Sequence, residues 1–229
     1  MKTMKLAHVN LPKPVLPSSL VTARRWLAFA IVGCIGIFVT YVAFNAIHES
    51  WANDGFPEAL AVKVDLLPII FPVHMVTGGL ALLMIPAVIA LRYTRWHRLA
   101  GRIAAIDVLI AGITALPVAW AAPVTLLSAA GFSAQALTWV SLLASGVWNI
   151  RHGRVTAHYK CMLLMAAVTS GAVFFRIYLA LWALYGSHAW FKTFYACDSW
   201  MAWMLPLAAM AMGLRIFGQP LAAGALTRV

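Results

Sequence analysis

The chain has 229 residues, of which 63% are hydrophobic and only 10% are charged. A soluble domain carries about 25% charged residues, and a chain of this length has too small an interior to hide so much apolar surface from water, so a water-soluble fold is excluded. The formal net charge is +11. The basic residues nevertheless cluster in short connections between apolar runs, a pattern typical of the cytoplasmic loops of membrane proteins, which argues against nucleic-acid binding.

Six apolar runs follow one another, each close to the ~20 residues that cross the hydrocarbon core of a bilayer. A basic N-terminal arm (residues 1–24) comes first, and a polar segment separates the first two runs. The sequence predicts an all-α integral membrane bundle of about six transmembrane helices within residues 25–218, followed by a C-terminal tail (residues 219–229). The predicted spans are residues 26–47, 66–91, 103–122, 132–150, 161–184 and 200–217.

The basic residues lie mostly on one side of this alternating topology. Lys63 and Lys192 fall on the opposite side, and Arg176 falls inside the fifth span. An excess of lysine and arginine marks the cytoplasmic side, so both termini are predicted to be cytoplasmic. Fourteen of the 17 basic residues share that side: Lys2, Lys5, Lys13, Arg24, Arg25, Arg92, Arg95, Arg98, Arg102, Arg151, Arg154, Lys160, Arg215 and Arg228.

Ionisable groups inside a membrane are costly, so His74 and Arg176 are candidates for function. Counting from the basic connections at 1.5 Å per residue places them about 27 Å and about 24 Å from the cytoplasmic face. At this shared depth they would line one polar site for a quinone, another cofactor or a substrate. Alternatively, Arg176 extends to the outer headgroups and His74 bonds a backbone carbonyl. Gly78 and Gly79 permit close approach of a flat ring or, more commonly, of another helix.

His97 and His158 open the third and fifth spans at one depth on the cytoplasmic side. A b-type haem in a helical bundle needs two neutral imidazoles that face each other from different helices. The sequence therefore favours His97 and His158 as axial metal ligands, with Arg98, Arg102 or Arg154 paired to the haem propionates. The alternative is that these two histidines only contact lipid headgroups or cap loops.

Asp107 lies about 8 Å inside the cytoplasmic face. It is expected to neutralise Arg98, Arg102 or His158, an interpretation favoured over a proton relay. The chain has no phosphate-binding glycine loop, no HExxH, no nucleophile elbow and no CxxC. A nucleotide-driven pump or a hydrolase of the soluble type is therefore not expected.

Over about residues 66–182, the chain resembles a family of bacterial multi-pass membrane proteins of unknown function. That family has a histidine and glycine in one helix, an HR-x-x-GR element opening the next, and later an H-x-x-x-M element with a downstream arginine. The matching positions are His74 with Gly78, then His97, Arg98, Gly101 and Arg102, then His158 and Met162, and Arg176.

The chain is more loosely similar to four-helix b-type cytochromes, which carry histidine pairs on alternate helices. His97 and His158 match one pair, whereas the fourth span has no histidine to pair with His74, so the resemblance implies one haem at most. The leading hypothesis is a haem b- or quinone-binding electron-transfer protein of the bacterial inner membrane. The alternatives are a non-catalytic accessory subunit of a respiratory or photosynthetic complex, and a small-molecule transporter. The expected partners are membrane lipids and other membrane subunits, with no nucleic acid.

Overall fold

The computed structural model describes residues 18–49 and 58–217, which contain no strand. Contacts divide the chain into two units, residues 1–38 and 39–229, so the boundary falls inside the first helix. The second unit holds the bundle and is the one described below. The helices are α1 (Ser18–Glu49), α2 (Glu58–Leu66), α3 (Ile70–Ala90), α4 (His97–Trp120), α5 (Leu126–Arg151), α6 (Val155–Tyr185), the 3-10 turn η1 (His188–Trp190) and α7 (Phe191–Phe217).

Four of these helices, α3 to α6, are long and apolar enough to cross a membrane. They have 21, 24, 26 and 31 residues, against the ~20 that a bilayer requires. Within the described residues, α1 adds a shorter apolar stretch, Gly33–His48, and α7 is 27 residues long. The predicted all-α multi-pass membrane bundle is confirmed. Residues 1–17 of the predicted arm and the whole predicted tail lie outside the described residues.

Helices α4 to α7 extend beyond the apolar runs from which they were predicted, whereas α3 is slightly shorter than its predicted span at residues 66–91. Helix α4 begins at His97 and α6 at Val155, each ahead of its predicted span. Hydropathy marks only the part immersed in lipid, whereas main-chain hydrogen bonds carry the helix on through polar interfacial residues. For the same reason α7 begins at Phe191, ahead of its predicted span at residues 200–217.

Four helices form a closed ring. Helix α3 packs against α4, α4 against α5 and α5 against α6, and a lighter contact between α3 and α6 closes the ring. Helices α4 and α6 are therefore opposite members of it, and α7 packs along both α5 and α6. The core draws on all five of these helices: Ala81, Ile85, Val108, Ala111, Trp139, Leu143, Met165, Val168 and Trp203.

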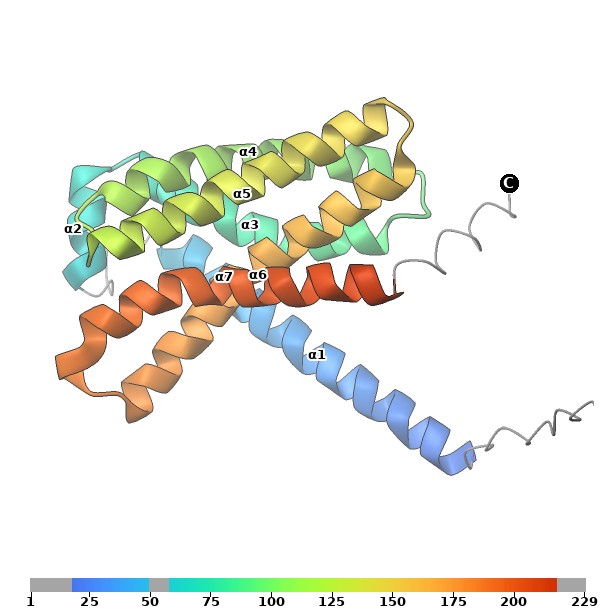
Figure 1. The fold of residues 1–229 in the computed structure, drawn as a ribbon, viewed down its shortest axis with the longest axis horizontal. Helices are drawn as coiled ribbons and strands as arrows, with labels where there is room; N and C mark the ends of the chain where they lie inside the picture. Colours follow the sequence, from blue (N-terminus) through green and yellow to red (C-terminus); the bar gives the residue numbers. More distant parts are fainter. Residues whose placement is uncertain (1–17, 50–57, 218–229) are drawn as a thin grey trace, which may run out of the picture. The chain divides into compact units, whose positions relative to one another are not determined.

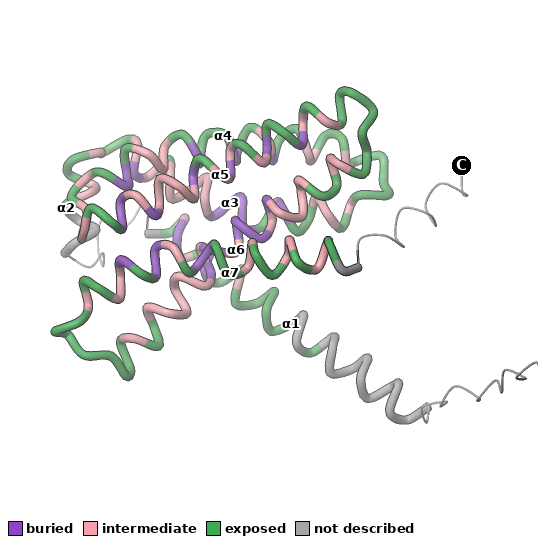
Figure 2. Tube along the Cα trace, in the orientation of Figure 1, coloured by how far each residue is buried: buried purple, intermediate pink, exposed green. Residues whose placement is uncertain are grey.

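Buried residues follow the inner faces of the helices, while much of the outer surface is apolar and exposed (Figure 2). Ile106, Ile113 and Leu137 are each more than half exposed. Patches of this kind are unfavourable in water and normal against lipid tails. The exposure pattern thus agrees with a bundle whose outer face contacts lipid.

Glycines set the closest helix contacts. A Cβ at Gly171 of α6 would lie 2.7 Å from the Trp203 Cβ and 3.0 Å from its Cα. A Cβ at Gly79 of α3 would lie 2.9 Å from the Ala43 carbonyl oxygen, whereas one at Gly78 would meet nothing within 4 Å. Small residues at helix contacts are typical of membrane bundles. Gly79 therefore serves helix packing, the commoner of the two expected causes.

Successive helices of the bundle run in alternating directions (Figure 1). The α3–α4 and α5–α6 connections consequently lie at one end, and the α4–α5 and α6–α7 connections lie at the other. The first pair holds the two arginine-rich segments, residues 92–102 and 151–154. The alternation expected from the charge pattern is therefore present in this part of the chain.

Candidate functional site

Two histidines at the arginine-rich end donate hydrogen bonds to main-chain carbonyls of the helix that precedes their own. Nδ1 of His97, the first residue of α4, donates to the Val88 carbonyl of α3 at 3.1 Å. Nδ1 of His158, in the first turn of α6, donates to the Gly146 carbonyl of α5 at 2.9 Å. A carbonyl only accepts, so the proton of each neutral ring is on Nδ1 and the lone pair is on Nε2. In the described part of the chain, no hydrogen bond occupies either Nε2.

Each of these histidines ties together a pair of helices joined by an arginine-rich connection. His97 links α3 to α4, and His158 links α5 to α6, so the two halves of the ring use equivalent devices. Arg98, Arg102 and Arg154 are exposed at the same end. The Arg154 guanidinium carbon lies 4.9 Å from the centroid of the Trp148 ring.

His74 of α3 lies near the other end of the ring, against α4. Its Nδ1 donates to the Ala111 carbonyl at 3.1 Å, and the Thr114 hydroxyl oxygen is 3.4 Å from the same nitrogen. That hydroxyl donates to the Ile110 carbonyl at 2.7 Å, so its lone pairs face the ring. Of the two interpretations of His74, the hydrogen bond to a backbone carbonyl is the one that the structure contains.

The charges of Arg176 and Lys63 both act on His74 electrostatically. Arg176 of α6 donates to the Ala172 carbonyl at 2.9 Å within its own helix. Lys63 of α2 donates to the Val118 and Ala121 carbonyls at 2.9 and 2.5 Å. The single polar site that the sequence predicts for His74 and Arg176 stays a prediction.

Thr114 beside His74 and Lys63 at the end of α4 are polar residues that sequence reasoning did not identify. Lys63 lies just before α3, and partial burial lowers the pKa of its ammonium group. It binds carbonyls at the end of α4, which have no partner within their own helix. A lysine in a short amphipathic segment between two spans was the available signal.

Asp107 of α4 is buried, and its Oδ2 has no hydrogen-bond partner among the described residues. In that part of the chain Asp107 is paired with none of its three expected partners, Arg98, Arg102 and His158. Among the described residues, no group of three or more His, Cys, Asp or Glu side chains is placed to hold a metal ion.

No curated protein and no solved structure matches the chain. A family model described as "Predicted membrane protein (DUF2306)" matches residues 71–213. This match spans α3 to α6 and most of α7, and so includes every candidate residue of these helices. The chain therefore belongs to the DUF2306 family of multi-pass membrane proteins.

Proposed function

We propose that the protein is an electron-transfer protein of the bacterial inner membrane that holds one b-type haem, with His97 and His158 as axial ligands. The proposal rests on the hydrogen-bonding arrangement that the two imidazoles have in common. Each is fixed by an Nδ1 hydrogen bond to a main-chain carbonyl, and each retains a lone pair on Nε2. Histidines that ligate metals are commonly oriented in this way.

The positions of the two histidines and of the nearby arginines also fit a haem. The two histidines belong to α4 and α6, opposite members of the ring, and both lie at the arginine-rich end (Figure 1). Axial ligands must approach a haem from its two faces, which favours opposite helices over neighbouring ones. Arg98, Arg102 and Arg154, exposed at the same end, have the charge and geometry to pair with propionates.

When bound, a haem supplies a one-electron couple, and the protein supplies its ligands and surroundings. The Nδ1 bonds favour the tautomer of each ring that leaves a lone pair on Nε2, and with these nitrogens the two histidines would hold the iron. The region around His74, Arg176, Lys63 and Thr114 has the donors to bind a quinone carbonyl or a carboxylate as redox partner.

The test is an absorbance spectrum of the detergent-purified protein, first oxidised and then reduced with dithionite. A reduced α band of b type is expected for the wild type, with near-complete loss in His97→Ala and in His158→Ala. His152→Ala is the matched control, because His152 is exposed and its Nδ1 donates to the Trp148 carbonyl of its own helix. A folded, haem-free wild type from cells with ample haem would refute the proposal and favour an accessory subunit. Equal loss in His152→Ala would remove the ligand assignment.

A further inference from the structure

A pocket of about 520 Å³ opens between the end of α6 and the start of α7. It lies at the opposite end of α6 from His158 and shares no residue with the histidine site. One of its walls is a stacked pair, Trp182 and Phe194, whose ring centroids are 4.2 Å apart and whose planes differ by 11°. Most of the lining is aromatic or aliphatic: Tyr178, Leu181, Trp182, Tyr185, Phe194 and Met201.

The length of α6 indicates the depth at which the pocket lies in a membrane. Helix α6 has 31 residues, or about 46 Å at 1.5 Å per residue, whereas the hydrocarbon core is about 30 Å thick. The surplus turns carry aromatic side chains, which favour the headgroup region. The pocket therefore lies at a depth that both lipid headgroups and water-soluble molecules reach.

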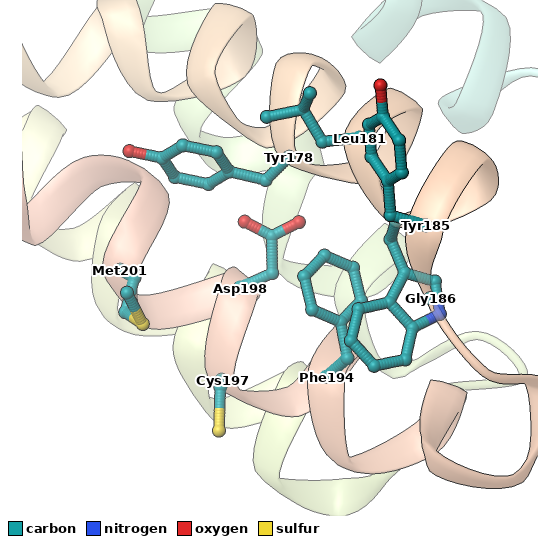
Figure 3. Close-up of a pocket in the computed structure, with 9 residues that line it drawn as sticks. Tyr178, Leu181, Tyr185, Gly186, Phe194, Cys197, Asp198 and Met201 are labelled. Carbon is teal, nitrogen blue, oxygen red and sulfur yellow. The ribbon is translucent and has the colours of Figure 1, made fainter.

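Among the residues that the structure describes, Asp198 is the only acidic one that lines the pocket. It is 2% exposed, and neither carboxylate oxygen has a hydrogen-bond partner within the described part of the chain. Figure 3 shows the carboxylate projecting from α7 into the space bordered by Tyr178, Leu181 and Tyr185. A buried carboxylate is stable only when it is paired with a donor or a cation. The pocket thus presents a negatively charged hydrogen-bond acceptor to any molecule that enters it.

We propose that this pocket binds an organic ammonium group, with Asp198 as its counter-ion and the aromatic side chains as its wall. Aromatic faces attract ammonium groups, more strongly where water is excluded, and the apolar lining accepts the rest of such a molecule. A metal ion fits poorly, because hard cations need several oxygen ligands and the described residues hold no cluster of metal ligands. An anion would be repelled by the carboxylate.

The ammonium group has two chemically equivalent sources, a soluble amine and the headgroup of phosphatidylethanolamine. The first probe is phenethylammonium, titrated calorimetrically into the detergent-purified full chain, with 2-phenylethanol as its neutral analogue. The ammonium compound is expected to bind at least about tenfold more tightly than the alcohol. Asp198→Asn is expected to remove this preference. Asp107→Asn, which alters a buried aspartate outside the pocket, is expected to retain it.

The lipid source is tested in nanodiscs of phosphatidylglycerol with and without phosphatidylethanolamine, using native mass spectrometry to detect retained lipid. Retention of phosphatidylethanolamine by the wild type and the Asp107 variant, but not by the Asp198 variant, identifies the headgroup. Binding of phenethylammonium without such retention identifies a soluble amine. Leu181→Trp fills the pocket and leaves Asp198 intact, so it should weaken binding even if the Asp198 variant fails to fold. Equal binding of amine and alcohol, or no binding of either ammonium source, overturns the proposal.

Discussion

At the scale of single residues, the bundle satisfies donors more readily than acceptors. In a helix each main-chain N–H is used once, whereas each carbonyl keeps a second lone pair. Side chains that donate therefore find partners on neighbouring helices, as His74 does at Ala111 and Gln135 does at Val168. Carboxylates can only accept when ionised, which explains why, within residues 18–49 and 58–217, the buried side-chain oxygens without partners belong to Asp107 and Asp198.

The buried hydrogen bond between Trp139 and Thr169 shows how much stability is lost when a donor loses its acceptor. The Trp139 indole N–H donates to the Thr169 hydroxyl at 2.9 Å, and both side chains are buried. Thr169→Val keeps the shape but leaves the indole N–H unpaired, which should lower the stability by about 1–3 kcal/mol. The measurement is thermal unfolding in detergent, with a lower Tm expected.

Ser170→Ala is the matched control, because the Ser170 hydroxyl bonds only the Ala167 carbonyl of its own helix. Its Tm should stay close to that of the wild type. A second check is the double variant Trp139→Phe with Thr169→Val. Removing both partners should recover part of the lost stability. A Thr169→Val protein as stable as the wild type would show that the buried bond contributes nothing.

At the scale of elements, the sequence predicts the apolar centre of each helix better than its ends. Twenty-residue apolar runs identified α3 to α6 because only lipid accommodates them. The start of α7 at Phe191 was missed because Lys192 and Asp198 lower the local hydropathy, although the helix packs an aromatic face on α6. The burial of Asp198 follows from that packing, which no hydropathy profile contains.

For the candidate site residues too, one property can be predicted from the sequence and another cannot. The first is depth along the helix, and the second is the hydrogen-bond partner of each ring. Depth along a helix is proportional to residue number, so a common level can be predicted for His74 and Arg176 from the sequence alone. The rotation of each helix, which sets the carbonyl that a ring meets, depends on contacts with other helices. The bonds of His97 to Val88 and of His158 to Gly146 were for this reason outside the reach of sequence reasoning.

The close contact between α6 and α7 at Gly171 predicts that a larger residue there lowers the stability of the bundle. Gly171→Ala would place a methyl group 2.7 Å from the Trp203 Cβ and 3.0 Å from its Cα, so α6 and α7 must separate. Overpacking of this kind costs about 1–3 kcal/mol, and the Tm in detergent should fall. Gly78→Ala is the control, because its Cβ would meet nothing within 4 Å, and a helical alanine is favoured over glycine by up to about 1 kcal/mol. Equal Tm changes for the two variants would contradict the packing at Gly171.

At the scale of the whole molecule, the two ends of the bundle differ in charge and in chemistry. The two arginine-rich connections lie at one end of the bundle (Figure 1). His97 and His158 lie in the first turns of the helices that follow these connections, whereas the pocket with Asp198 lies beside the α6–α7 connection. If the arginine-rich end is cytoplasmic, the proposed haem faces the cytoplasm and the ammonium pocket opens toward the periplasm. The orientation of the protein therefore decides which compartment supplies each ligand.

Cysteine accessibility measures this orientation directly. In a variant with Cys34, Cys161 and Cys197 replaced by serine, one cysteine is introduced at Thr94 or at Ser187. Both positions are exposed, and Thr94 lies in the α3–α4 connection while Ser187 lies in the α6–α7 connection. A membrane-impermeant maleimide applied to intact spheroplasts should label Ser187→Cys and should label Thr94→Cys only after lysis. The reverse result would place the arginine-rich end outside, against the charge rule, and would move the proposed haem site to the periplasmic side.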